Sequence, residues 1–191
     1  MEYTQREYAL FSACGLNCGL CPRYHTNGTS RCPGCAGAGF ADKHPACGVL
    51  SCAQRHQVDY CCLCGEFPCP RYDNADQADS FITHRNQFAD LAKWAAVGQD
   101  AYRAELDNKV EILRELLADY DDGRRKSFYC IAVNLLDLRA VQEIMETLRA
   151  LAGTVAVVKE RAALAVRLLQ KAAMESNIDL KLRKKQGTIE G

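Results

Sequence analysis

The spacing of hydrophobic residues divides the chain into two unlike parts. In the first 70 residues branched aliphatic side chains are scarce and follow no regular period. Beyond residue 75 hydrophobic residues recur every three or four positions, which is the period of an amphipathic helix. We therefore expect a small, loop-rich module over residues 1–75, without a regular hydrophobic pattern, and an all-α helical bundle over residues 76–191.

About four helices are expected in the second part. The first has an apolar face and a stop at Gly98, because glycine commonly ends a helix. The second follows Asp100 and ends before Gly123. The expected inward residues are Phe81, Phe88, Leu91 and Ala95 in the first helix, and Tyr102, Leu106, Val110, Leu113, Leu117 and Tyr120 in the second.

The remaining C-terminal segments are less uniform. Residues 126–133 form a continuous apolar run, so periodicity alone leaves helix and short strand open. Asp137 and Thr154 are suitable N-caps for two further helices, the first closed by Gly153 and the second reaching about residue 176. Their expected inward residues are Leu138, Val141, Met145, Leu148 and Ala152, then Val155, Val158, Ala162, Leu169 and Ala172. The polar tail beyond Asn177 is expected to fray.

Cysteine dominates the first part of the chain. Eleven of the twelve cysteines lie between Cys14 and Cys69, and all five prolines and eight of the thirteen glycines lie between Cys14 and Arg71. Such a segment has too little apolar surface to stabilise a fold alone. Structural zinc contributes ~10–16 kcal/mol in short peptides, which is enough to supply the difference.

Three CxxC pairs recur in this segment, at 18/21, 32/35 and 61/64. A gap of two residues lets one tight turn direct two sulfurs at one point, as a tetrahedral metal requires. The start of the chain lacks a secretory signal, and a reducing cytoplasm favours metal binding over disulfides. The predicted metal ligands are Cys14, Cys18, Cys21, Cys32, Cys35, Cys47, Cys52, Cys61, Cys64 and Cys69.

The spacing leaves the identity of the metal and the grouping of the ligands open. The pairs 18/21 and 32/35 suit one four-cysteine zinc site, and Cys47, Cys52, Cys61 and Cys64 suit a second, although cross-braced pairing is equally allowed. Cys14 and Cys69 are then left over, for a third site completed by His25, His44 or His56. The alternative is one or more [4Fe-4S] clusters, since Cys14-x3-Cys18-x2-Cys21 matches the spacing that holds such a cluster in radical enzymes. The chain has no strand–helix alternation to build their barrel.

Charge and length limit the expected partners. The chain has 24 basic and 24 acidic residues, and no run is long and apolar enough to span a membrane. A four-thiolate zinc site carries about −2, so two such sites make the module acidic, unlike zinc fingers that read DNA. We expect a cytoplasmic protein with a protein partner, without membrane or nucleic-acid ligand. No small-molecule substrate is identified.

Two cysteines fall outside the predicted ligand set. Cys62 is adjacent to Cys61 and is interpreted as a bystander. Cys130 lies in an apolar run and is expected to be a buried core residue; as an alternative, it approaches the module as a ligand or reactive thiol.

Four stretches carry a resemblance to a known family: CGLNCGLC at 14–21, CPGC at 32–35, CGVLSC at 47–52 and CCLCGEFPC at 61–69. They resemble the cysteine-rich family known as domain of unknown function 3795, over about residues 11–75. The helical remainder, with RKSFYC at 125–130, resembles the longer members. The resemblance implies metal binding by the ten cysteines above and no established activity. Members are found largely in anaerobic bacteria and archaea, which favours the iron–sulfur alternative by association.

The sequence therefore predicts a multi-zinc protein that acts as an adaptor or binding protein. Closed four-thiolate shells offer no open coordination position, so catalysis is not expected. The competing hypothesis is an iron–sulfur protein in electron transfer or associated with a redox enzyme.

Overall fold

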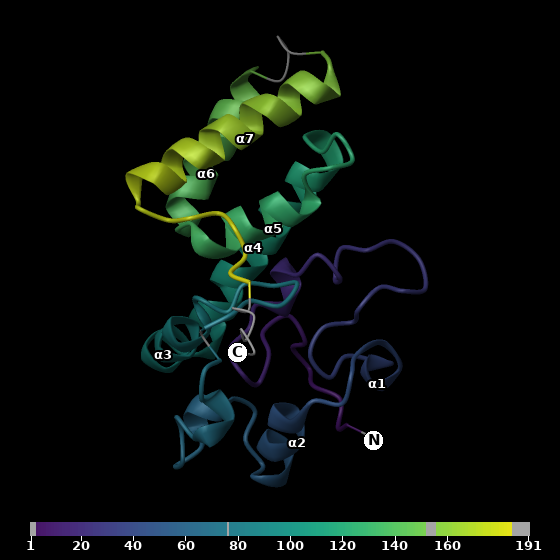
Figure 1. The fold of residues 1–191 in the computed structure, drawn as a ribbon, viewed down its shortest axis with the longest axis vertical. Coiled ribbons are helices and arrows are strands. Elements are labelled where there is room, and N and C mark those ends of the chain that lie inside the picture. The colour runs from purple at the N-terminus through teal and green to yellow at the C-terminus, as the bar shows by residue number, and fades with distance from the viewer. Residues whose placement is uncertain (1–2, 76, 152–155, 185–191) are drawn as a thin grey trace, which may run out of the picture.

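The computed structural model describes residues 3–75, 77–151 and 156–184 (Figure 1). Every regular element in these ranges is a helix, and none is a strand. In chain order they are η1 (Cys18–Leu20), α1 (Phe40–Lys43), α2 (Gly48–Arg55), η2 (Cys61–Leu63), η3 (Pro70–Tyr72), α3 (Gln87–Val97), α4 (Gln99–Asp119), α5 (Lys126–Leu135), α6 (Leu138–Leu151) and α7 (Val158–Glu175). No helix among them is both long and apolar enough to cross a lipid bilayer.

Helix α4 is the centre of the helical part. It packs against α3, α5 and α6, and also against η1 of the cysteine-rich part. Helices α6 and α7 pack against each other at the end of the molecule away from the loops (Figure 1). The described ranges beyond residue 76 hold five helices rather than about four, because the apolar run at 126–133 forms α5.

The predicted helix faces are mostly confirmed. Gly98 ends α3 with φ +85°, and Leu91 is fully buried. Phe81 is an exception, because it precedes α3 and its side chain is 43% exposed, with the Arg23 guanidinium 5.1 Å from its ring centre. Ala95 is exposed as well. In α4, the predicted residues Tyr102, Leu106, Val110 and Leu113 are buried.

The last two helices follow the same pattern. The Asp137 carboxylate accepts the backbone N–H of Arg139 at 2.8 Å, as expected at the start of α6. Val141, Met145 and Leu148 of α6 are buried, as are Ala162 and Leu169 of α7, which ends at Glu175 as predicted. Val158 was expected to face inward but is 41% exposed. The predicted roles of Ala152, Gly153, Thr154 and Val155 lie outside the described residues.

The segment after α7 is held against the rest of the protein, at least to residue 184. Arg183 forms an ion pair with Asp79 at 3.0 Å, and its backbone N–H donates to the same carboxylate at 2.8 Å. Arg85 donates to the carbonyl of Lys181 at 2.9 Å. The backbone of Asp179, Lys181 and Arg183 therefore has partners on the segment before α3.

The cysteine-rich part shares a core with the bundle. Phe11, Leu20 and Tyr60 are fully buried in the cluster that contains Leu91 and Tyr102. The ring of Phe11 lies 4.5 Å from that of Tyr102 and 5.3 Å from that of Tyr60. A second, smaller cluster lies within the module itself, built on Phe40, Leu50, Ala53 and Tyr72.

A buried polar network also joins the two parts. Asn17, between Cys14 and Cys18, donates to the Asp90 carboxylate at 2.7 Å and to the side-chain oxygen of Asn134 at 2.9 Å. The Tyr102 hydroxyl donates to Asn17 at 2.9 Å. Burial raises the pKa of Asp90 to about 6, although Lys109 and these hydrogen bonds oppose the rise. The cysteine loop is thus held against α3, α4 and α5 by polar groups that have partners.

Asp90 gives the protein a specific pH dependence. Its pKa in the folded protein lies above the ordinary value of 3.8, so the unfolded chain releases this proton first and ionisation favours unfolding. Relative to Asp90→Asn, the wild-type free energy of unfolding should therefore fall by about 1 kcal/mol between about pH 5 and about pH 7.5. Urea denaturation at both pH values measures this difference. The control is Asp119→Asn, which removes an exposed carboxyl and keeps Asp90. Relative to this variant, the wild type should show no such fall, and an equal fall relative to both variants would contradict the assignment to Asp90.

Candidate functional site

Two of the CxxC pairs are formed around short 3-10 turns. In η1 the backbone N–H of Cys21 donates to the carbonyl of Cys18 at 3.1 Å, and in η2 Cys64 donates to Cys61 at 3.0 Å. The third pair, Cys32 and Cys35, encloses Gly34, which has φ +88°. A Cβ on Gly34 would collide with the carbonyl of Ala9, so this turn requires glycine. All three turns bring two cysteines to one side of a tight bend.

The four predicted ligands outside the CxxC pairs lie in a turn, at helix N-caps and within a helix. Cys14 lies in the turn before η1, and Cys47 is the N-cap of α2. Cys52 lies within α2, and Cys69 is the N-cap of η3. None of the twelve cysteines, all of which lie in the described ranges, forms a disulfide.

Cys18 and four neighbouring cysteines interact electrostatically, and Cys47 interacts with two of these four. Burial raises the pKa of Cys18 well above its usual value, and the neighbouring thiols of Cys35, Cys14, Cys21 and Cys32 raise it further. Cys47 acts in the same direction on Cys14 and Cys35. These residues form what we term the first thiol group: Cys14, Cys18, Cys21, Cys32, Cys35 and Cys47.

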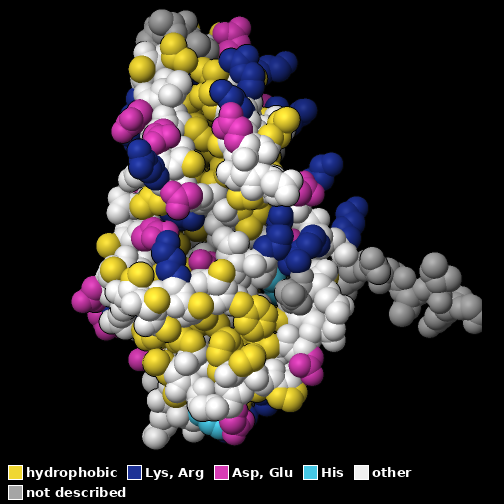
Figure 2. All heavy atoms as spheres, turned by 90° about the vertical axis from the view of Figure 1, so that its left-hand side faces the viewer, with side chains coloured by type: hydrophobic (Ala, Val, Ile, Leu, Met, Phe, Trp, Pro, Cys, Tyr) yellow, Lys and Arg dark blue, Asp and Glu magenta, His cyan; other side chains and the backbone are white. Residues whose placement is uncertain are grey.

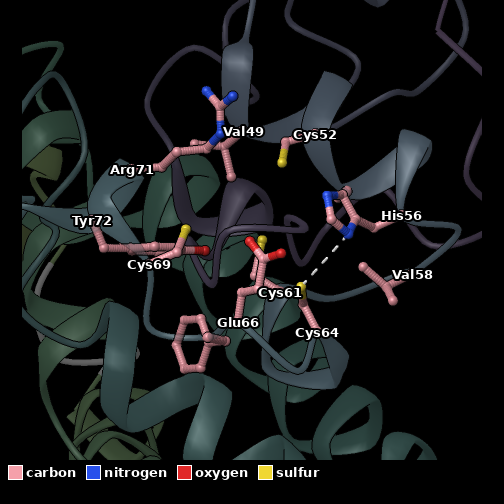
Figure 3. Close-up of a pocket in the computed structure, with 12 residues that line it drawn as sticks. Val49, Cys52, His56, Val58, Cys61, Cys64, Glu66, Cys69, Arg71 and Tyr72 are labelled. Carbon is pink, nitrogen blue, oxygen red and sulfur yellow. Dashed lines mark hydrogen bonds between the residues drawn. The ribbon is translucent and has the colours of Figure 1, made fainter.

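The four predicted ligands outside the first thiol group line one small cavity of about 30 Å³. These residues, Cys52, Cys61, Cys64 and Cys69, form the second thiol group. Figure 3 shows the sulfurs of Cys52, Cys61 and Cys64 directed toward a common space, together with the imidazole of His56. The Cys64 sulfur lies 4.0 Å from Nδ1 of His56. A cavity of this size holds a water molecule or a single ion and excludes an organic substrate.

The second thiol group is partly shielded from water. Burial raises the pKa of Cys61 to about 11, and the neighbouring Tyr72 hydroxyl opposes this rise. Tyr72 itself is held in place by Phe67, whose ring lies 5.1 Å away, edge to face. The charge of Cys14 also acts on Cys61, so the two thiol groups are neighbours.

Hydrogen-bond donors are directed at several of the sulfurs. The Ser12 hydroxyl lies 3.1 Å from the Cys14 sulfur and accepts the backbone N–H of Leu16 at 2.7 Å. The Leu50 N–H donates to the Cys47 sulfur at 3.5 Å, and the nearby backbone of Arg23 and Tyr24 opposes the rise that burial causes in the pKa of Cys21. Such donors favour the charged form of a thiol, which is the form that binds metal.

The donor chemistry fits thiolate-bound metal, although the side chains are not arranged at coordination distances. Among the described residues, no three His, Cys, Asp or Glu side chains are close enough to form a metal site as they lie. Sulfur donors in sets of four suit zinc or an iron–sulfur cluster. The second thiol group would supply one such set, and four members of the first group would supply another.

The grouping differs from the one first suggested by spacing. Cys69 lies with Cys52, Cys61 and Cys64, whereas Cys47 lies with Cys14 and Cys35. The spacing did not indicate that Cys47 and Cys69 have these neighbours. Their positions depend on α2, which places Cys47 at its N-terminus and Cys52 about one turn further on.

The histidines considered for a third site lie apart from one another. Nε2 of His25 is 2.7 Å from the carbonyl of Gly19, and Nδ1 of His44 is 2.7 Å from that of Pro45. Only His56 lines the cavity of the second thiol group. Glu66 and Tyr72 also line it, and the sequence analysis did not identify either of them.

Cys62 and Cys130 belong to the hydrophobic core. Cys130 is 2% exposed on α5, which confirms that it is a buried core residue, and burial raises its pKa to about 12. The charge of Cys21 contributes to this rise, so Cys130 also lies near the first thiol group. Cys62 is partly buried against the main core and does not line the cavity that Cys61 lines.

Comparison with known proteins supports the family resemblance. Residues 10–74 match the model of a family described as "Protein of unknown function (DUF3795)", which confirms the similarity identified from the cysteine motifs. The match covers both thiol groups and ends before α3. No curated protein and no solved structure matched the chain.

Proposed function

We propose that this protein binds metal ions through cysteine thiolates at two or more sites, with zinc as the metal. Residues 10–74, which resemble that family, contain all ten proposed ligands. The observation that carries the proposal is the cavity shared by Cys52, Cys61, Cys64 and Cys69, which is large enough for an ion. The first thiol group provides the ligands of the remaining metal.

The geometry supports a binding role rather than catalysis. Four sulfurs complete the tetrahedral shell that zinc prefers, so no position is left for a substrate or water. The cavity of about 30 Å³ is also too small for an organic ligand. We therefore propose a non-catalytic adaptor or binding protein that works in the reducing cytoplasm.

The apolar surface around α3 supports a protein partner. Leu63 on η2 is 52% exposed and Val97 at the end of α3 is 48% exposed, and η2 and α3 pack against each other. Figure 2 shows that the face on which α3 lies carries many apolar side chains and few charges in its lower part. Exposed apolar areas of this kind are typical of protein–protein contacts.

An iron–sulfur cluster is the second candidate for the first thiol group. Cys14, Cys18 and Cys21 have a spacing that suits such a cluster, and the structure brings Cys35 near Cys18 as a fourth thiol. This alternative makes the protein an electron carrier or a partner of a redox enzyme. A broad absorbance near ~400 nm with stoichiometric iron would favour it over zinc.

Two adjacent cysteines provide the sharpest test of the second site. Cys61→Ser is expected to lose one metal ion per chain, because its sulfur lines the cavity. Cys62→Ser removes the neighbouring thiol and is expected to keep the wild-type metal content, because Cys62 lies against the core instead. Elemental analysis of both variants, purified without oxygen, measures the difference.

Serine in place of Cys62 costs some stability, so the metal content is measured on folded monomer separated by gel filtration. Equal metal content in Cys61→Ser and the wild type would show that the second thiol group is not a metal site.

A further inference from the structure

A separate cleft lies on the side of the bundle where α4 and α5 meet. It has a volume of about 500 Å³ and is lined by the loop that joins Cys21 to Cys32 and by the α4–α5 corner. The loop contributes Tyr24, His25 and Arg31, and the helices contribute Arg114 and Lys126. We term this the basic cleft. Its size suits a small organic ligand.

Positive charge converges in the basic cleft. Burial lowers the pKa of His25, and the charges of Arg114, Arg31 and Lys126 lower it further, so three cations act on one imidazole. They come from three separate elements: a loop, α4 and the first turn of α5. Like charges held together in this way leave unfavourable interactions that a bound anion would relieve.

Two nearby carboxylates, those of Asp121 and Glu111, have partners of their own and offset part of the positive charge. Asp121 lines the cleft, but its Oδ1 accepts the backbone N–H groups of Gly123 and Arg125, both at 2.9 Å. Glu111 pairs with Arg114 on the exposed surface of α4. Neither Arg31 nor Lys126 has a carboxylate within ion-pair distance among the described residues.

The cleft is also held in shape before any ligand binds. The Arg31 guanidinium lies 4.7 Å from the centre of the Tyr24 ring, and its Nε donates to the Tyr24 carbonyl at 3.0 Å. Lys126 is the first residue of α5, whose N-cap Arg125 makes no side-chain capping bond. The dipole of that helix end adds to the positive potential. Fixed donors of this kind bind an anion with little loss of conformational entropy.

We propose that the basic cleft binds a small phosphorylated molecule. Arginine and lysine side chains together with a helix N-terminus are the groups that recognise phosphate in proteins. A small molecule fits better than a nucleic acid, because the chain has no net charge and the cleft has a volume of about 500 Å³. No thiol takes part in the binding itself, but the loop between Cys21 and Cys32 lies in the part that we expect metal to keep folded, so the cleft is tested in the metal-loaded protein.

Inorganic pyrophosphate is a suitable probe, titrated into the metal-loaded full chain by calorimetry. We expect a Kd below about 1 mM in moderate salt. Lys126→Gln and Arg114→Gln should each weaken binding about tenfold, because each removes one charge-assisted contact. Arg139→Gln removes the same charge from an exposed i,i+4 pair on α6 and should leave binding unchanged.

The metal content of all three variants should equal that of the wild type, because none of these residues belongs to a thiol group. Absence of pyrophosphate binding, or an equal loss in Arg139→Gln, would overturn the proposal. Tighter binding of a single-stranded oligonucleotide than of pyrophosphate, abolished by Lys126→Gln, would also overturn it by identifying a nucleic-acid surface.

Discussion

Removal of bound metal by a strong chelator, with reductant present, is expected to unfold residues 10–74 while α4–α7 keep their helical structure. The apolar core within the module consists of a few side chains, such as Phe40, Leu50 and Tyr72. Thiolate-bound zinc contributes ~10–16 kcal/mol in small domains, far more than a core of that size. Hydrogen exchange followed by mass spectrometry resolves the two parts, because α4–α7 form their own peptides.

The loss of the module should also weaken the bundle. Phe11 and Tyr60 leave the shared core when the module unfolds, which exposes Tyr102 and Leu91 to water. Protection of α3 and of the N-terminal half of α4 should therefore fall more than that of α6 and α7. Protein treated with zinc-saturated chelator serves as the control. Unchanged protection of residues 10–74 in metal-free protein would contradict the proposed role of the metal.

Gly15→Ala is expected to destabilise the protein by about 3 kcal/mol. Gly15 has φ +93°, and a Cβ there would lie 2.5 Å from the carbonyl oxygen of Gln87 and 2.7 Å from Cγ of Leu91. The turn that carries Cys14 would have to move away from α3. Thermal unfolding of the metal-loaded protein measures the loss.

Gly28→Ala provides the matched control. Gly28 also has positive φ, at +80°, but a Cβ there meets no atom within 4 Å. Its cost should therefore be limited to the left-handed backbone strain, about 1 kcal/mol. The difference between the two variants isolates the contact of the cysteine loop with α3. Equal losses in both variants would mean that this contact does not hold the loop in place.

Periodicity predicted the helices that have one solvent-exposed face and one buried face. Helices α4 and α6 cover the surface of a core, so their buried residues recur at the helical period. Periodicity did not distinguish helix from strand at 126–133, because Tyr129 to Asn134 are buried without interruption. Phe81 was misassigned because its ring contacts Arg23 across the surface, a tertiary contact that spacing does not reveal.

Spacing predicted the turns of the thiol groups but not the grouping of their cysteines. A CxxC pair is local, so η1 and η2 follow from the positions of Cys18, Cys21, Cys61 and Cys64. The division between groups depends on how α2 lies against the η2–η3 segment, which brings Cys52 and Cys69 to one cavity. Burial of Asn17 beside Asp90 is likewise tertiary and has no signature in either local sequence.

X-ray absorption on protein purified without oxygen tests the thiolate sites most directly. It identifies the metal from its absorption edge and counts the sulfur ligands around it. Zinc at two or more ions per chain, with four sulfurs at about 2.3 Å, is the expected result. Metal-free folded protein, or metal bound mainly by nitrogen and oxygen, would contradict it.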